Sequence, residues 1–268
     1  MLGLTIWMAT VVTGQRLYYP VEYTGIGPTA INSGHLSAPA YSVQHPAAPV
    51  TDANFSAAVY AEKKYMSSEL VNLLAVSTFS NEKSSTLFAF QQFGYTGYRE
   101  RQVTLGYCKN LGAISAGVQF RYIITKSLHQ KIISGIWTMA GAAWKLSETV
   151  TAAIKLVNPR QFFQTSDSTT FRFASAFQLG FGYQVNESLY IGIESAKEEQ
   201  QPHGVAALIL FKPADKYLIR AWWITHSNQP GLIIAWKSGA TEICTGISYH
   251  RVLGITPSAG LVLHSKKK

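Results

Sequence analysis

The chain has 268 residues and a net charge of +9, and only 14% of its residues are charged while 47% are hydrophobic. A soluble domain carries about 25% charged residues at a similar apolar content, so disorder is excluded and a globular soluble fold is disfavoured. After the first dozen positions no apolar run approaches the ~18 residues of a membrane-spanning helix. Neutral polar residues interleaved with aromatic and branched residues are what a transmembrane β-barrel requires, because each strand faces lipid on one side and the lumen on the other. A large soluble β-sandwich is the competing interpretation.

The basic excess is spread along the chain. Apart from the pair Lys63 and Lys64, lysines and arginines stand singly, many at the ends of strand-like segments, and the only run of three is Lys266 to Lys268 at the C-terminus. No basic stripe with spaced aromatic residues occurs, so nucleic acid is not an expected partner. Positions at a barrel rim that face anionic lipid or a partner protein explain the pattern better.

Residues 1–15 form an apolar stretch that ends in small and polar residues. It is too short to span a membrane and is similar to the apolar region and cleavage zone of a secretory signal peptide, although a positive start is missing. We therefore expect a signal-peptide remnant and export from the cytoplasm. A first buried strand is the alternative.

Residues 16–53 have a different character, with several glycines, no regular period and five prolines, which are Pro20, Pro28, Pro39, Pro46 and Pro49. Prolines at this density exclude a central strand or a long helix. The stretch is also too apolar to remain in solvent. We predict an N-terminal plug segment here, followed by a barrel over residues 54–268.

Alternation with a period of two begins near residue 54 and is clearest at residues 114–122, where apolar side chains occupy one phase and Ser115, Gly117, Gln119 and Arg121 the other. A similar pattern runs through residues 170–185, with Ser175 as the single break. Because the pleat fixes the phase, the alternation predicts one outward and one inward set. The outward set is Val118, Phe120, Phe173, Phe177 and Phe181, and the inward set is Gln119, Arg121, Arg172 and Gln178.

Segments of this kind, each closed by a turn cluster, recur about 14 times. They are 54–66, 70–80, 86–95, 100–109, 113–126, 131–145, 149–158, 170–185, 188–197, 203–212, 216–226, 230–238, 241–251 and 258–265. An even number suits an antiparallel transmembrane barrel. The predicted fold class is therefore all-β, an antiparallel transmembrane-type barrel of about 14 strands, with 12 as the alternative.

The strands within residues 203–238 are apolar on both phases, so their inner face needs an apolar cover. The plug segment, a hydrophobic ligand or a partner protein are the candidates. The adjacent Trp222 and Trp223 are expected to point to opposite faces. Aromatic residues at strand ends also have a simpler explanation, which is a belt at the membrane interface.

Residues that carry chemistry are sparse. Cys108 and Cys244 fall in distant segments and are expected to stay unbridged, and no metal-binding spacing or cofactor motif occurs. The weak hydrolase candidates are His226 and His250, with Ser227 and Ser248 nearby. We expect a protein that is not an enzyme and has no cofactor or metal.

Motifs at residues 34–50, 90–123 and 153–159 resemble the PorV/PorQ group of Bacteroidota outer-membrane proteins, within the wider family of FadL-like transporters. Residues 34–50 match the N-terminal signature of that group, with His45, Pro46, Ala47, Ala48 and Pro49 in the place of an Asn-Pro-Ala-Ala-Leu-like element. Residues 90–123 resemble a strand pair with Phe-Gly-Tyr and Leu-Gly-Tyr elements, and residues 153–159 resemble a segment ending in Asn-Pro. The resemblance covers about the first 160 residues.

The resemblance implies an outer-membrane barrel, with lipid as its surroundings, that serves the type IX secretion system as a partner or plug of a large SprA-like translocon. A FadL-like transporter of hydrophobic small molecules is the alternative. The last strand lacks the usual terminal aromatic residue, which keeps docking at the periplasmic face of the membrane as an alternative to lipid insertion. The candidate plug and partner residues are Tyr18, Tyr19, Tyr41, His45, Pro46, Trp222, Trp223 and Trp236.

Overall fold

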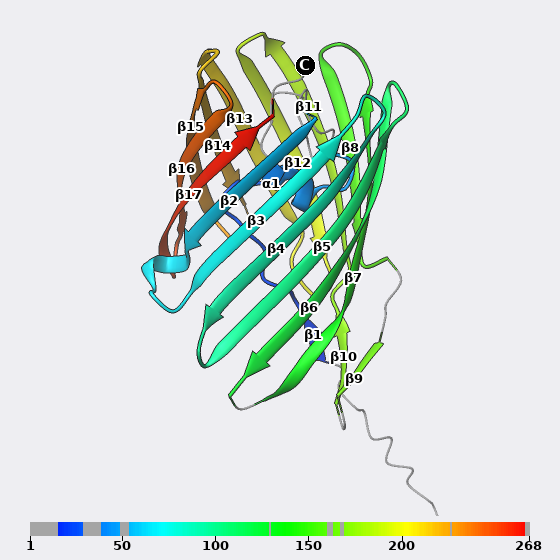
Figure 1. Cartoon of the computed structure of the whole chain (residues 1–268), viewed down its shortest axis with the longest axis vertical. Helices are drawn as coiled ribbons and strands as arrows, with labels where there is room; N and C mark the ends of the chain where they lie inside the picture. The colour runs from blue at the N-terminus through cyan, green and yellow to red at the C-terminus, as the bar shows by residue number, and fades with distance from the viewer. Residues whose placement is uncertain are drawn as a thin grey trace, which may run out of the picture.

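A computed structural model describes residues 16–28, 39–48, 54–128, 130–159, 163–166, 169–225 and 227–265. Its main feature is a closed barrel of 14 antiparallel strands, in which the last strand pairs with the first (Figure 1). The all-β fold class and the strand number of 14 are therefore confirmed. The predicted signal-peptide remnant at residues 1–15 lies outside the described residues.

The strands follow the predicted segments closely along the whole chain. They are β2 (Phe55–Lys63), β3 (Val71–Ser80), β4 (Ser84–Tyr95), β5 (Tyr98–Asn110), β6 (Ile114–Ser127), β7 (Gln130–Lys145), β8 (Val150–Val157), β11 (Ala176–Asn186), β12 (Leu189–Glu198), β13 (Gly204–Ala214), β14 (Tyr217–Ile224), β15 (Gln229–Ser238), β16 (Thr241–His250) and β17 (Gly254–His264). Strands that follow one another in the sequence are hydrogen-bonded to each other in almost every case, because short turns bring antiparallel strands together.

The two ends of the barrel differ. At the end drawn uppermost in Figure 1, which we call the turn end, short turns such as 187–188 and 215–216 join the strands and the last strand finishes. At the other end, the loop end, lies the longest connection, residues 158–175 between β8 and β11. Short turns mark the periplasmic end of an outer-membrane barrel and longer loops its outer end.

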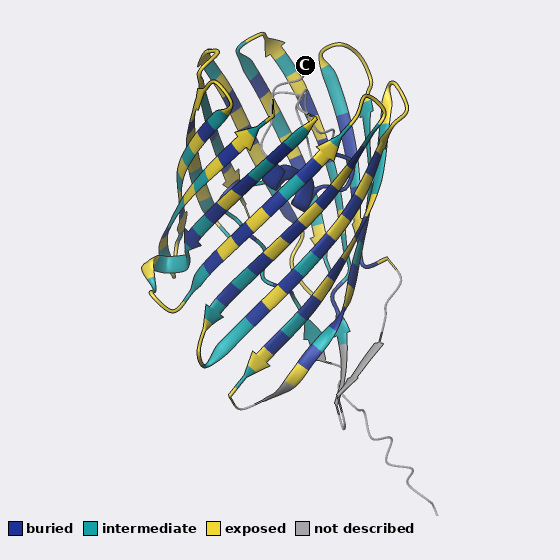
Figure 2. Cartoon of the chain, viewed as in Figure 1, coloured by how far each residue is buried: buried dark blue, intermediate teal, exposed yellow. Residues whose placement is uncertain are grey.

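Burial alternates along the strands as the pleat requires (Figure 2). Phe120 is 57% exposed while its neighbours Gln119 and Arg121 are buried. The predicted outward positions of Val118, Phe120, Phe177 and Phe181 are confirmed, since all four side chains are exposed. Gln178, predicted to face inward, lines an interior cavity.

The predicted strand at residues 170–185 is wrong in one respect. The chain leaves one sheet and enters another at Ala174 and Ser175, so residues 169–173 do not belong to the barrel. Phe173, predicted to point outward, is only 2% exposed and packs in the interior with Tyr18, at a distance of 5.8 Å between ring centroids. Arg172 pairs with Glu199 at the loop end. The inward and outward phases on the two sides of such a break are independent of each other. In the sequence, Ser175 is the position of this break.

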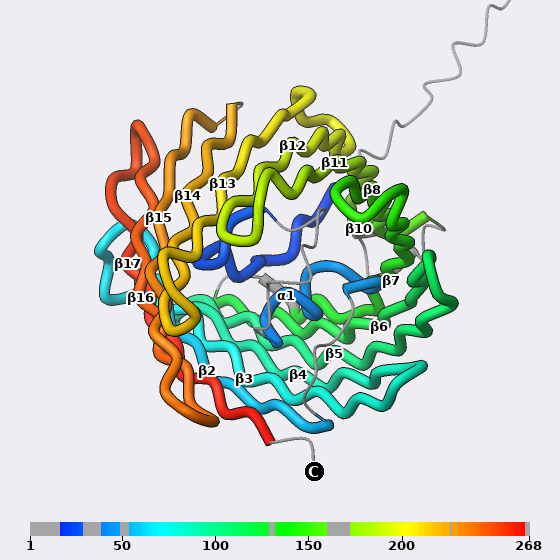
Figure 3. Tube along the Cα trace, turned by 90° about the horizontal axis from the view of Figure 1, so that it is seen from above, coloured from blue at the N-terminus to red at the C-terminus, as the bar shows by residue number. Residues whose placement is uncertain are grey.

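The remaining elements are short. β1 (Arg16–Tyr18), β10 (Thr169–Phe173) and β9 (Phe163–Ser166) form a separate three-stranded sheet, in which β1 runs parallel to β10. The helix α1 (Pro39–Gln44) lies inside the ring of strands (Figure 3), and the 3-10 helix η1 (Lys64–Met66) follows β2. No helix among the described residues is long and apolar enough to cross a membrane.

Candidate functional site

The lumen of the barrel holds a segment of the chain itself. We call residues 16–28 and 39–48 the lumenal segment; they are the described parts of the predicted plug. The segment begins at the loop end, where β1 pairs with β10, and includes α1, all of whose residues are buried (Figure 3). The candidate site is the contact between this segment and the inner wall.

One side of the contact is apolar. Tyr23, Ile26, Tyr41 and Val43 of the lumenal segment belong to one buried cluster with wall side chains. The largest wall members of the cluster are Tyr60, Leu74, Leu87, Tyr190, Leu208, Leu210, Trp222 and Ile233. The apolar inner face of the strands within residues 203–238 is therefore covered by the lumenal segment.

Trp222 is held between two glycines. A Cβ atom on Gly27 of the lumenal segment or on Gly231 of β15 would lie 2.6 Å or 2.1 Å from atoms of the indole ring. Gly27 also has a φ of +71°, which favours glycine. The indole thus fills a slot that only these two residues leave open, while the adjacent Trp223 points outward and is 55% exposed.

The other side of the contact is polar and begins with two buried carboxylates. Glu100 of β5 accepts hydrogen bonds from the Val21 amide at 2.8 Å and from the Tyr18 hydroxyl. Glu62 of β2 accepts hydrogen bonds from the amide and the hydroxyl of Thr24, both at 3.0 Å. The side chains of two wall strands therefore satisfy backbone groups of an irregular segment, which would otherwise be buried without partners.

Carbonyl groups of the segment are satisfied in the same way. Gln91 of β4 and Gln102 of β5 both donate to the Val21 carbonyl, at 2.8 and 2.7 Å. Arg220 of β14 donates to the Pro28 carbonyl, and its guanidinium lies 5.0 Å from the centre of the Tyr41 ring. A buried arginine that makes both contacts holds the two parts of the lumenal segment to the same strand.

The helix α1 ends against three donors from the wall. Gln119 donates to the Ser42 carbonyl, Arg121 to Val43 at 3.1 Å and Lys155 to Gln44 at 2.9 Å. The last carbonyls of a helix lack partners within it and carry partial negative charge. Two cationic side chains and one amide from β6 and β8 therefore fix the C-terminal end of α1.

The turn after α1 packs directly on the wall. His45 and Pro46 are buried, and the Ala47 amide donates to His45 Nδ1 at 3.2 Å. The paired glycines Gly117 and Gly141 lie beneath them, and a Cβ on Gly117 would lie 2.1 Å from the Pro46 carbonyl oxygen. The missing side chains in β6 and β7 make room for this turn.

A cavity of about 220 Å³ remains between the lumenal segment and strands β7, β8, β11 and β12. Its charged lining comes from Glu22, Lys155 and Glu198, and Tyr19 and Trp137 contribute aromatic surface. Arg121 lies against the same Trp137 ring, at 4.9 Å, and 3.8 Å from the Glu22 carboxylate. The cavity is therefore a mixed polar and aromatic space near the loop end.

The candidate residues from the sequence fall into two groups. Tyr18, Tyr19, Tyr41, His45, Pro46 and Trp222 lie inside the barrel, where only Tyr41 and Trp222 share one cluster, while Trp223 and Trp236 lie on its outer face. Trp223 stands near the loop end and Trp236 near the turn end, where interface aromatics are expected. The structure does not bring these two together with the others.

Sequence reasoning missed most of the wall residues that hold the segment. The missed set is Glu62, Gln91, Glu100, Gln102, Lys155 and Arg220, whereas Gln119 and Arg121 were predicted to face inward. The alternation of the sequence does place each of these residues in the inward phase of its strand. It does not show that they bind the lumenal segment, because an inward polar residue fits a water-filled lumen equally well.

The described residues weighed for catalysis lie at the loop end but do not pair as a serine and a histidine: Gln229 contacts both Ser227 and Ser248, and His250 Nδ1 accepts from the amides of the turn that follows it. His250 is partly exposed next to the loop-end turn, Ser248 is buried in β16, Ser227 lies in the β14–β15 turn, and His226 lies outside the described residues. Within the described part of the chain, no group of three or more metal-binding side chains is placed to hold a metal ion. Cys108 of β5 and Cys244 of β16 are both free and lie five strand positions apart around the barrel.

No protein-family model and no curated protein matches the sequence. Among solved structures, the chain is similar to the CymD monoaromatic hydrocarbon channel, with a TM-score of 0.61 and 7% identity over 81% of this chain and 90% of that chain. A porin mutant of Rh. blastica aligns with a TM-score of 0.47 and 6% identity, over 79% of this chain and 99% of that chain. At such identities the likeness to CymD shows the fold alone, which is that of an outer-membrane β-barrel.

Proposed function

We propose that the chain is a closed, non-enzymatic outer-membrane barrel that acts as a partner or plug subunit of a large protein-secretion translocon of the type IX kind. The observation that carries the proposal is the use of the inner polar side chains. Glu62, Glu100, Gln119, Arg121 and Lys155 bind backbone groups of the lumenal segment. In a conducting lumen, polar side chains of this kind would contact water and solute instead of the protein backbone.

The way in which the lumenal segment is held supports constitutive closure. Donors and acceptors come from strands on several sides of the barrel, and an apolar cluster completes the contact. Each hydrogen bond contributes about 0.5–1.5 kcal/mol, so opening requires the loss of many contacts together. A barrel closed in this way acts through its outer surface and its ends.

The nature of the partner rests on the resemblance of residues 34–50 and 90–123 to the PorV/PorQ group. In that setting the partner is a large SprA-like barrel, and the present barrel is either inserted beside it or docked at the periplasmic face. The outward apolar residues serve both arrangements, since lipid and an apolar protein surface make similar contacts.

Affinity purification of the tagged full chain from outer-membrane extract, followed by native mass measurement, tests the proposal. The expected result is a complex with one large barrel protein. A full chain that is recovered only with lipid contradicts the partner role. A conductance recording of the same preparation in a planar bilayer is expected to show a closed barrel.

A transporter of hydrophobic small molecules is the second candidate, and the cavity of about 220 Å³ beside Trp137 favours it. A protein of this fold, CymD, is a monoaromatic hydrocarbon channel. Uptake of a small aromatic hydrocarbon by proteoliposomes that contain the full chain separates the candidates. Rapid uptake supports the transporter, and uptake equal to that of empty liposomes supports the closed partner barrel.

A further inference from the structure

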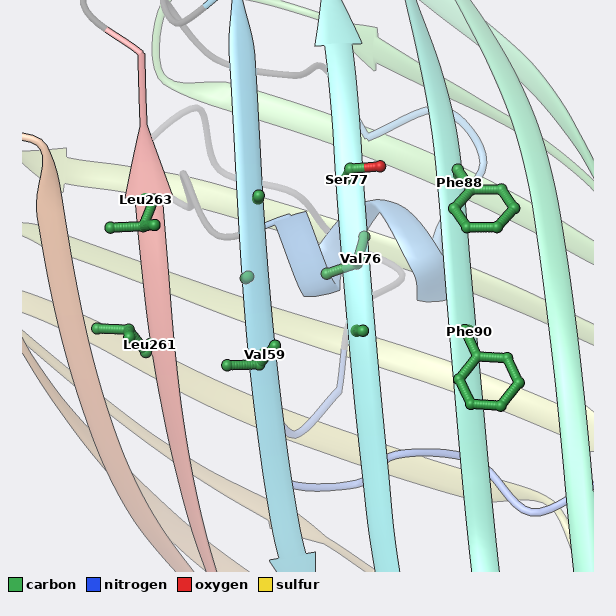
Figure 4. A pocket seen from close by; sticks show the side chains of 10 residues that line it. Val59, Val76, Ser77, Phe88, Phe90, Leu261 and Leu263 are labelled. Carbon is green, nitrogen blue, oxygen red and sulfur yellow. The ribbon is translucent and has the colours of Figure 1, made fainter.

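An apolar groove of about 340 Å³ lies on the outer face of the barrel over β2 and β3 (Figure 4). Its sides are formed by Leu261 and Leu263 of β17 and by Phe88 and Phe90 of β4. Its floor is formed by Ala57, Val59, Ala75 and Ser77. The groove exists because three of these four floor residues are small, whereas the flanking strands present leucine and phenylalanine.

The pairing register gives the groove its direction. Ala57 pairs with Leu263 and Ser77, and Ser77 pairs with Phe88, so one row of residues runs across four strands. Val59, Ala75 and their partners form the next row toward the loop end. The groove therefore runs along the strands, between the ridges of β17 and β4.

Basic side chains stand at the loop-end side of this groove. Gln92 follows Phe88 and Phe90 in the outward phase of β4, and Arg101 of β5 donates to its amide oxygen at 3.1 Å. Arg99 and Lys126 form the neighbouring cross-strand pair. They point outward because the adjacent Glu100 and Thr125 are buried inside the barrel.

Basic side chains outnumber acidic ones on this surface. Lys63 ends β2, one of the two strands that form the floor, and brings the basic residues at the loop-end side of the groove to four. The acidic residues nearby in the sequence, Glu62 and Glu100, face inward and bind the lumenal segment. Glu69 in the loop after η1 is exposed. An anionic group is therefore favoured at the end of an apolar groove.

We propose that this surface binds one phosphorylated membrane lipid, with an acyl chain in the groove and the phosphate on Arg99, Arg101 and Lys126. Arginine and lysine at a membrane surface attract anionic lipid headgroups. Arg99, Arg101 and Lys126 lie about four residues along the strands and about three strand spacings across the sheet from the middle of the groove, so the phosphate site is ~20 Å away, the length of an extended palmitoyl chain. The proposal is independent of any partner protein.

Native mass spectrometry of the full chain in detergent tests the proposal. The probes are dipalmitoyl phosphatidic acid, dipalmitoyl glycerol, which lacks only the phosphate, and inorganic phosphate. The wild-type barrel is expected to retain phosphatidic acid at least tenfold more tightly than the glycerol lipid and not to retain inorganic phosphate. Equal retention of the two lipids, or a phosphate ion that displaces the lipid, would overturn the proposal.

Two variants address the two halves of the site. The triple variant R99Q/R101Q/K126Q is expected to weaken phosphatidic acid on the order of 100-fold, at about fivefold for each charge. Ala75→Phe fills the groove and is expected to weaken both lipids. Lys109→Gln, on the outer face of β5 at the turn end, and Ala116→Phe, on the outer face of β6, are the matched controls.

Both controls are expected to bind like the wild type, and all four variants are expected to keep the mobility of the folded barrel in a gel without heating. A triple variant that retains phosphatidic acid like the wild type, or a Lys109→Gln variant that loses it equally, would remove the basis for this site. An Ala75→Phe variant that retains both lipids unchanged would place the acyl chain elsewhere and contradict the proposal.

Discussion

The inner wall of the barrel holds the same segment by two different means. Strands β12 to β15 present Tyr190, Leu208, Trp222 and Ile233 and hold the lumenal segment through apolar packing. Strands β5 to β8 present Glu100, Gln119, Arg121 and Lys155 and hold it through hydrogen bonds to its backbone. The apolar packing requires particular side chains in the lumenal segment. The hydrogen bonds to its backbone groups depend little on its sequence.

Deleting residues 20–45 removes both kinds of contact and has the largest expected effect. Without the apolar cover and the backbone partners, the lumen fills with water. We expect steady conductance in planar bilayers, or a lower melting temperature if the barrel depends on the segment for stability. A deletion variant with the conductance and the melting behaviour of the full chain would show that the segment does not close the lumen.

Substitution of Trp222 tests the apolar side. Trp222→Ala leaves a void between Gly27 and Gly231 and is expected to lower the free energy of unfolding by about 3–5 kcal/mol. Urea unfolding in lipid vesicles, followed by tryptophan fluorescence, measures the effect. Trp223→Ala, which removes the outward neighbour, is the control and is expected to cost clearly less. Equal costs would contradict the tight packing of Trp222 against the segment.

A methyl group added to a wall glycine tests how closely the turn after α1 packs against β6 and β7. In Gly117→Ala the new Cβ would lie 2.1 Å from the Pro46 carbonyl oxygen, so the turn must shift. We expect a loss of about 1–3 kcal/mol in the free energy of unfolding. Gly141→Ala, with its Cβ 3.2 Å from the His45 ring, is expected to cost less. The reverse order would mean that the turn is seated differently on β6 and β7.

The smallest effect is expected for single hydrogen bonds on the polar side. Gln91→Met or Gln102→Met alone leaves the Val21 carbonyl with one donor, so Gln91→Met is expected to cost about 0.5–1.5 kcal/mol. Gln102→Met also removes the hydrogen bond that this amide donates to Glu100 and is expected to cost more. The double variant leaves the carbonyl without either donor and is expected to cost more than the sum. Outward Gln92→Met, which loses only an exposed hydrogen bond from Arg101, serves as the control and is expected to cost less. Strict additivity would show that the two amides do not share one acceptor.

The amino-acid sequence alone determined the barrel. Alternation with a period of two, regular turn clusters and a low charge content are local properties, so they predicted the fold class, 14 strands and most of their bounds. The sequence also indicated that residues 16–53 are not part of the wall, since proline removes a backbone donor. Its single misplaced outward residue, Phe173, came from one strand assigned across the break at Ser175.

Only the tertiary structure decided what the inward residues do. Glu62, Gln102 and Lys155 stand far apart in the sequence and meet the lumenal segment only after the barrel closes. The outer groove also arises from closure, since its side on β17 and its floor on β2 come from opposite ends of the barrel sequence. Local periodicity states which side of a strand a residue occupies, but the partner of that residue depends on contacts between distant parts of the chain.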